Sequence, residues 1–324
     1  MIGIPSLRAI FKPEYLFRPN QIPWKLWREY LGRREEVKKA RLPWGLEIEV
    51  NTGESIGWSI YTRALYETTV TESLWRLPRV GDLVVDVGAN IGYMTSILAL
   101  RVGARGRVYS FEPHPSIFHE LQLNVTNWSG NRRCGPIILY NAALGSHEEV
   151  GKLYVPDYFC RNQGTSWIGP RDAEFSGQTF DVALLALDDV FPNGETIGVI
   201  KLDVQGYELT VLRGMERILR ERRVRHVVFE EEGGFPAPTH AFLSDMGYES
   251  YGIEQHFGGI RFARNRKPFC DPVNGPSPNY LATIVSEADV SALGGGFWQS
   301  FGPAQFLTDR LRRIGGVKAN PANR

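Results

Sequence analysis

The amino-acid sequence predicts an α/β fold in which parallel strands alternate with helices. Residues 83–87 form a short apolar run interrupted by Asp86, as expected of a buried parallel strand, and a glycine turn and a helical spacing over 94–102 follow. A second buried strand begins at residue 197 and leads through another glycine turn into a helix that ends near residue 219. Two units of this kind indicate a parallel sheet that is covered by helices.

The turn of the first unit is the most informative stretch. Gly88 and Gly92 bracket it, so a ligand can approach the backbone and the unpaired N–H groups of the following helix. The next strand covers residues 107–111, and Glu112 follows it directly. An acid about 20 residues after such a turn is placed to accept hydrogen bonds from ribose hydroxyls. This order favours a nucleoside site over an ordinary βαβ unit with an incidental acid.

The polar residues of the turn indicate the kind of nucleoside. The pattern Asp86-x-Gly88-x-Asn90-x-Gly92 lacks the close glycine pair of the dinucleotide-binding sequence, whose glycines approach a pyrophosphate. A carboxylate at the end of the strand suits a ligand with a cationic amino-acid portion, and S-adenosylmethionine has one. The stretch resembles the first motif of class I methyltransferases.

Composition excludes several classes of protein. The chain has 324 residues, of which 43% are hydrophobic and 23% charged, and its net charge of +1 creates no field that would favour nucleic acid. Its 3 cysteines show no C-x-x-C spacing, so neither a disulfide framework nor a zinc site is expected, and a reducing cytoplasmic location fits. The start does not resemble a signal peptide, and no apolar run is long enough to span a membrane.

We expect an N-terminal arm over residues 1–60, a catalytic domain over 61–288 and a C-terminal extension over 289–324. Basic and aromatic residues interleave over residues 8–45, a pattern that can lie on an anionic membrane surface. Interspersed glutamates favour the other interpretation, in which the arm packs its aromatic residues on the main domain. In either interpretation the arm could cover the active site. Nothing in the sequence indicates the oligomeric state.

The remaining elements follow from apolar periodicity and turn residues. Glu67, at the start of one helix, is either a favourable helix-start carboxylate or a cofactor contact. We predict helices over 66–77, 117–125 and 240–246, and strands over 46–50, 137–144, 150–155, 179–185, 225–232, 247–253 and 280–286.

An excursion separates the two halves of the predicted sheet. Residues 150–155 and 179–185 are expected to pair as a β-hairpin, and the long polar loop between them is either a variable surface feature or a wall of the acceptor pocket. The loop residues with ligand-binding chemistry are Arg161, Asn162, Gln163 and Trp167.

Three acids are candidates for chemistry. Asp203 ends the second buried strand, and it should face the same crevice as Asp86 because ligands of open α/β sheets bind beyond the carboxyl ends of the strands. Glu208 begins the next helix, where a carboxylate is stabilised, and Glu230 follows the strand that begins near residue 225. Ala142 and Ala143 are small enough to leave room for an adenine ring, or are simply close-packed.

Four motifs together resemble the FkbM family of methyltransferases: residues 85–92, 111–113, 141–145 and 200–208, within a likeness that covers about residues 60–286. The resemblance implies a seven-stranded class I fold whose seventh strand is antiparallel. It also implies S-adenosylmethionine-dependent O-methylation of a small molecule, natural product or sugar. The family usually has glutamate where this chain has Gln205, a departure that leaves any shared role of that residue open.

The family motifs also imply a set of binding residues. The methionine end of the cofactor would be held by Asp86, Gly88, Asn90 and Gly92, and the ribose by Glu112. Ala142 and Ala143 would flank the adenine, and Pro113 and Asp203 complete the set of cofactor-binding residues.

An alcohol acceptor needs a base to take its proton. Asp203 is the first candidate, followed by Glu230 and Glu208, and the same acids could instead hold Mg²⁺. Two other classes compete with this interpretation, a nicotinamide-dependent oxidoreductase and a non-catalytic cofactor-binding protein. A nucleic-acid methyltransferase is disfavoured by the near-neutral charge.

Overall fold

The structure is a computed structural model that describes residues 35–169, 175–256, 258–264, 270–271, 275–276 and 279–301. Most of the predicted basic and aromatic arm, and all of the chain after residue 301, lie outside the described residues. The membrane contact expected of that arm therefore stays a prediction.

Strands and helices alternate through the middle of the chain. The strands are β1 (Val37–Arg41), β2 (Glu47–Asn51), β3 (Leu83–Val87), β4 (Arg107–Phe111), β5 (Ile137–Tyr140), β6 (Ala143–Leu144), β7 (Glu149–Pro156), β8 (Trp167–Ile168), β9 (Gly177–Leu185), β10 (Ile197–Leu202), β11 (Val224–Glu230), β12 (Glu249–His256), β13 (Gly259–Arg264), β14 (Cys270–Asp271), β15 (Gly275–Pro276) and β16 (Asn279–Thr283). The helices are α3 (Ser55–Arg63), α4 (Thr68–Arg76), α5 (Tyr93–Val102), α6 (Pro115–Trp128), α7 (Leu187–Val190), α8 (Glu208–Arg213), α9 (Glu216–Arg220), α10 (Pro238–Asp245) and α11 (Glu287–Gly294).

The main sheet confirms the predicted α/β class. In the described chain its order is β13-β12-β16-β11-β10-β3-β4-β5, and β5, β4, β3, β10 and β11 are mutually parallel. β16 runs antiparallel to β11, as expected of a seventh strand in this class. Strand order reverses between β3 and β10, because the chain builds outward through β4 on one side and β11 on the other.

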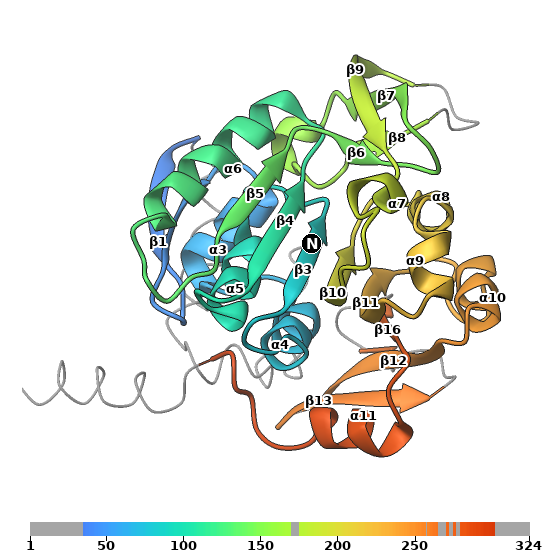
Figure 1. Cartoon of the computed structure of the whole chain (residues 1–324). Helices are drawn as coiled ribbons and strands as arrows, with labels where there is room; N and C mark the ends of the chain where they lie inside the picture. The colour runs from blue at the N-terminus through green and yellow to red at the C-terminus, as the bar shows by residue number, and fades with distance from the viewer. Residues whose placement is uncertain are drawn as a thin grey trace, which may run out of the picture.

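Alternation along the strands divides the core into two layers. Val84 packs into one apolar cluster with Leu74 of α4 and Ile97 of α5. Its neighbour Val85 belongs to the other cluster, with Leu212 of α8. The sheet is therefore covered on both faces, as Figure 1 shows. Burial on both faces explains the continuous apolar runs that identified these strands.

Among the described residues the sheet has eight strands, one more than the seven expected. β13 pairs antiparallel with β12, buries Ile260 and Phe262, and packs against α11. The predicted helix that ends near residue 219 is divided into α8 and α9. At the division, a Cβ on Gly214 would lie 1.8 Å from the carbonyl oxygen of Gly145, so the backbones meet there.

A second sheet stands above the carboxyl ends of β4 and β5 (Figure 1). It has the order β6-β9-β7-β8, and β7 and β9 form the predicted hairpin in antiparallel register. The predicted strand over 137–144 is divided between the sheets, because β5 ends at Tyr140 and β6 pairs with β9. The excursion is thereby fixed over one end of the main sheet.

The described part of the N-terminal region packs on the main core. Ile48 of β2 and Ile60 of α3 are fully buried in the same cluster as Val84, and Trp298 joins this cluster from the other end of the chain. The domain boundaries near residues 60 and 288 stay predictions. No helix within the described residues is long and apolar enough to cross a bilayer.

Candidate active site

A cavity of about 240 Å³ lies at the carboxyl ends of β3, β4, β10 and β11, where the strand order reverses. This is the position at which open α/β sheets bind ligands. Of the residues that the sequence predicted, the lining includes Gly88, Asn90, Glu112, Pro113, Ala143, Asp203 and Glu230. The predicted residues that lie outside the lining are Asp86, Gly92, Ala142 and Glu208.

The turn after β3 forms the floor of the cavity. Gly88 has φ +73°, and a Cβ there would lie 2.1 Å from the carbonyl oxygen of Asp203, so the two strand ends approach too closely for a side chain. A side chain at Gly92 is excluded by a different neighbour. A Cβ on it would lie 2.7 Å from Cδ1 of Leu121, which shows that Gly92 packs against α6 and not against the cavity.

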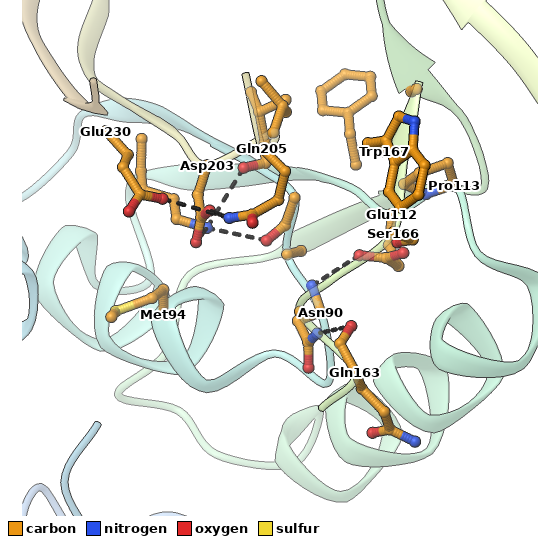
Figure 2. Close-up of a pocket in the computed structure, with 18 of the residues that line it drawn as sticks. Asn90, Met94, Glu112, Pro113, Gln163, Ser166, Trp167, Asp203, Gln205 and Glu230 are labelled. Carbon is orange, nitrogen blue, oxygen red and sulfur yellow. Dashed lines mark hydrogen bonds and ion pairs between the residues drawn. The ribbon is translucent and has the colours of Figure 1, made fainter. Parts of the chain in front are cut away.

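Glu112 is buried at one end of the cavity. Its carboxylate accepts hydrogen bonds from the backbone amides of Asn90 and His114, both at 2.9 Å. Burial raises the pKa of Glu112 to about 7, and these two hydrogen bonds oppose the shift. Asn90 also binds the excursion, because its Nδ2 donates to the carbonyl of Gln163 at 3.2 Å (Figure 2). The acid thus joins the turn to the next strand.

Asp86 lies beneath the turn and is fully buried. Its carboxylate accepts a hydrogen bond from the Thr95 hydroxyl at 2.6 Å and lies 3.5 Å from Nζ of Lys201, its register partner on β10. Lys201 also donates to the carbonyl of Gly88 at 2.9 Å. Asp86 therefore has a cation within the protein, and its direct contact with a ligand stays a prediction.

The other end of the cavity is acidic. Figure 2 shows Asp203, Gln205 and Glu230 together, and Glu67, which precedes α4, also lines the cavity. Nε2 of Gln205 donates to Asp203 at 3.1 Å and to Glu230 at 3.3 Å. Lys201 lies 3.5 Å from Asp203 as well as from Asp86. We call Glu67, Asp203 and Glu230 the cavity acids.

Two of the cavity acids have strongly shifted pKa values. Burial and the neighbouring Asp203 raise the pKa of Glu230 to about 8, and the same two causes raise the pKa of Glu67 to about 7. Burial opposes the charge of Lys201, yet Asp203 and Asp86 raise the pKa of its ammonium. Lys201 therefore stays charged, while Glu67 and Glu230 titrate near neutral pH.

Glu208 is turned away from the cavity. Its carboxylate accepts hydrogen bonds from the backbone amides of Val204 at 3.3 Å and Gly206 at 3.2 Å. It therefore holds the loop between β10 and α8, on which Asp203 and Gln205 are carried.

The excursion supplies a wall of the cavity. Gln163, Ser166 and Trp167 line it, and the ring of Trp167 stacks on Tyr154 with centroids 5.9 Å apart. Figure 2 shows Trp167 near Glu112 and Pro113. Asn162 also lines the cavity, whereas Arg161 lies outside the lining, and its carbonyl accepts a hydrogen bond from the Ser55 hydroxyl at 2.9 Å.

Comparison with known families decides the identity of this fold and site. The model of the methyltransferase FkbM domain matches residues 86–250, which is half of the chain. The chain belongs to the FkbM methyltransferase family. The match begins at Asp86 and includes Glu112, Lys201, Asp203 and Glu230.

Two curated methyltransferases are similar in sequence. Methyltransferase sdnD of Sordaria araneosa is 29% identical over 222 residues, which cover 59% of this chain and 83% of sdnD. Hexuronic acid methyltransferase AglP of Haloferax volcanii is 29% identical over 156 residues, which cover 47% of this chain and 57% of AglP.

Two solved structures are also similar. Methyltransferase FkbM from Methylobacillus flagellatus KT is 17% identical, with a TM-score of 0.40, and the match covers 63% of this chain and 43% of that one. An S-adenosylmethionine-dependent O-methyltransferase from Thermotoga maritima is 14% identical, with a TM-score of 0.37, and the match covers 77% and 78% of the two chains.

As a member of the FkbM family, the chain is an S-adenosylmethionine-dependent methyltransferase. The cavity suits this cofactor. Gly88 leaves the floor bare of side chains, and Glu112 offers carboxylate oxygens at the end where a ribose is expected. The acids at the opposite end suit a cationic group. A nicotinamide-dependent oxidoreductase, the competing interpretation of the βαβ start, is not supported.

Mg²⁺ has no support in this FkbM protein. Within the described residues, no group of three or more His, Cys, Asp or Glu side chains is arranged to hold a metal ion. Asp203 contacts Lys201 and Gln205, and Glu230 contacts Gln205.

Lys201 was not predicted as a site residue, although the structure places it among the residues that line the cavity. A signal was present, because Lys201 interrupts an otherwise apolar buried strand. A lysine in such a position requires carboxylate partners. Asp86 occupies the equivalent position of β3, and the two residues face each other in the parallel register.

Proposed function

We propose that this protein is an O-methyltransferase that methylates a hydroxyl group of a small molecule or sugar, with Asp203 as the base. The observation that carries the proposal is the position of Asp203, which lines the cavity at the switch point of the sheet with its side chain 26% exposed. Its relative AglP is named for a hexuronic acid, which supports a sugar-like acceptor.

Different parts of the cavity would bind different parts of the cofactor. The carboxylate of Glu112 is placed to accept hydrogen bonds from the ribose hydroxyls. Pro113, Ala143 and Leu144 offer an apolar surface for the adenine. The backbone of Gly88 and Asn90 would contact the methionine portion, while Asp86 and Lys201 support the turn from beneath. When bound, S-adenosylmethionine supplies a methyl group on a sulfonium, which leaves as a neutral thioether.

The three candidate acids differ in their fitness as a base. The carboxylate of Glu208 is occupied by two backbone amides of its loop. Glu230 holds a proton at neutral pH, since burial and Asp203 raise its pKa to about 8. A protonated Glu230 can donate a hydrogen bond to the acceptor, but it cannot take its proton. Asp203 therefore removes the hydroxyl proton as the acceptor oxygen bonds to the methyl carbon.

The wall formed by the excursion has a second task. Trp167 and Gln163 stand over the cavity and restrict water, which lets the acids and Lys201 act on the bound groups in a low-dielectric environment. The protein otherwise has little chemistry to perform, because methyl transfer requires mainly the alignment of donor and acceptor.

The test is Asp203→Asn, assayed for methyl transfer against a panel of hydroxylated small molecules and sugars. We expect turnover to fall by roughly 10²–10⁴-fold, the usual contribution of a general base, with cofactor affinity retained in calorimetry. Glu148→Gln is the matched control, because Glu148 is an exposed acid that lies outside the cavity lining. Full turnover in Asp203→Asn would exclude Asp203 as the base.

A further inference from the structure

Gln205 stands between the two acids at the acceptor end of the cavity. It lies in the loop between β10 and α8 with φ +54°, a left-handed conformation that is unfavourable for a glutamine. Its amide is directed back toward the cavity, as Figure 2 shows. Nε2 donates to Oδ1 of Asp203 and to Oε2 of Glu230, so one amide group contacts carboxyl groups from two different strands.

The surroundings of Gln205 are dominated by negative charge. Asp203 and Glu230 contact its amide, and Glu67 enters the cavity from the start of α4. Glu208 of α8 and Glu232 beyond β11 lie near enough to raise the pKa of Glu230 further. Lys201 is the cation that lines the cavity within the described chain, and it is shared between Asp86 and Asp203.

An amide and a carboxylate have opposite effects at this position. The amide has two N–H donors and no charge, so it can satisfy two carboxyl groups at once. A third carboxylate would have to share protons with its neighbours, because like charges at such distances cannot all ionise. A shared proton would raise the pH above which Asp203 is ionised and able to accept the proton of the acceptor.

We propose that Gln205 is a positioning residue, whose neutral amide holds Asp203 and Glu230 together while leaving Asp203 free to act as the base. This inference rests on the proposed function. Gln205 thereby sets the pH range in which the enzyme works, although its amide does not itself exchange a proton. Gln205 joins Asp203, the base that directly follows β10, to Glu230, the hydrogen-bond donor at the end of β11.

The experiment compares the pH dependence of kcat/KM in the wild type, Q205E and Q205M. Q205E adds a carboxyl group, whereas Q205M keeps the size of the side chain and removes the donor. We expect the acidic limb of the profile to move to higher pH in both variants, by on the order of one unit in Q205E and by less in Q205M. Superimposable profiles for all three proteins would overturn the proposal.

A second readout does not depend on an acceptor. In carboxyl-¹³C-labelled full-length protein, the Glu230 signal is identified by its loss in E230Q, and its titration is followed in the wild type and in Q205E. We expect its midpoint to rise in Q205E, and an unchanged midpoint would contradict the proposal. If no acceptor is methylated but the midpoint moves, the proposed function fails while the coupling through Gln205 stands.

Folding is checked by thermal melts of each variant. Should Q205M or Q205E fail to fold, Q205G provides the donor-free variant, since glycine adopts φ +54° without strain. In Q205G we expect the acidic limb to move in the same direction as in Q205M, and an unmoved limb would again overturn the proposal.

Discussion

Two groups of buried charges in this protein differ in how fully the protein itself satisfies them. The first is the pair Glu72–Arg76 on α4, with side chains 0% and 3% exposed and Nε 2.6 Å from Oε1. Glu72 also accepts hydrogen bonds from Gln299 and Ser300, and Arg76 donates to three backbone carbonyls, those of Leu293, Gly295 and Phe297. Every one of these distances is 2.9 Å or less.

The second group is formed by Lys201 and the cavity acids. The ion pairs of Lys201 are long, because its Nζ lies 3.5 Å from both Asp86 and Asp203. The hydrogen bond that the Gln205 amide donates to Glu230 is also long, at 3.3 Å. Burial and Asp203 raise the pKa of Glu230 to about 8. Charges with short internal partners hold a fold, whereas long contacts and shifted pKa values are typical of groups that act on a ligand.

The two groups are connected through α4. The Glu72–Arg76 pair binds the segment from Leu293 to Ser300 to this helix, and Glu67 enters the cavity immediately before its first residue. The C-terminal segment is therefore anchored to the helix that Glu67 immediately precedes. The predictions below separate the structural group from the functional one.

The largest expected effect on stability is that of Glu72→Gln. The change leaves Arg76 charged and buried without its carboxylate, and breaking a buried pair in this way costs about 3–5 kcal/mol. Urea denaturation of the wild type and the variant measures the difference in the free energy of unfolding. A loss below about 1 kcal/mol would show that the pair does not anchor the C-terminal segment.

Glu112→Gln should act on ligand binding instead. Hydrogen bonds to a charged group contribute about 1.5–3 kcal/mol. At a pH above 7, where Glu112 is ionised, we therefore expect the dissociation constant for S-adenosylmethionine to rise roughly 10–100-fold. Isothermal titration calorimetry measures it, and Glu148→Gln serves again as the control with unchanged affinity. An unaltered dissociation constant in Glu112→Gln would remove this acid from the cofactor site.

The pH dependence of stability should be smaller but diagnostic. Because the pKa of Glu230 is raised to about 8 in the folded protein, by burial and by Asp203, its proton favours the folded state. Its contribution is fully present below the ordinary glutamate pKa of 4.5 and is lost as the pH rises through the folded-state pKa of about 8. Glu230→Gln should therefore weaken the fall in unfolding free energy between about pH 5 and pH 8. Identical slopes for the two proteins would contradict the raised pKa.

The smallest effect is expected at the surface. Glu216 and Arg220 form an ion pair at 2.6 Å, as short as Glu72–Arg76, but their side chains are 41% and 60% exposed. Exposed pairs contribute at most about 1 kcal/mol, so Glu216→Gln should change the unfolding free energy by roughly 0.5 kcal/mol or less. A loss as large as that of Glu72→Gln would show that burial does not distinguish the two pairs.

The parts of the fold that were predictable are those set by local sequence. β3 and β4 have the predicted bounds, because β3 is a buried β-branched run that ends at a glycine turn and β4 is a short run that ends just before an acid. α3 was not predicted, since its start depends on the carboxylate of Glu54, an uncommon N-cap that accepts hydrogen bonds from Ile56 and Gly57. β13 was missed for a similar reason, because a short edge strand gains its burial from α11.

The site was predictable to the strand ends but not beyond them. Sequence places Asp86, Glu112 and Asp203 at one edge of the sheet, and the structure confirms that arrangement. The sequence does not reveal that Lys201 and Asp86 are opposite each other on the adjacent strands β10 and β3. That requires the register between strands whose residues are far apart in the chain. The direction of Glu208 likewise depends on the backbone of the loop that it holds.

The most direct test of the account is calorimetric titration of the purified full chain with S-adenosylmethionine and, separately, with NAD. The account predicts saturable one-to-one binding of S-adenosylmethionine, retained in Asp203→Asn and weakened in Glu112→Gln, and no binding of NAD. Absence of S-adenosylmethionine binding, or binding that neither Glu112 nor Gly88 substitutions affect, would contradict it.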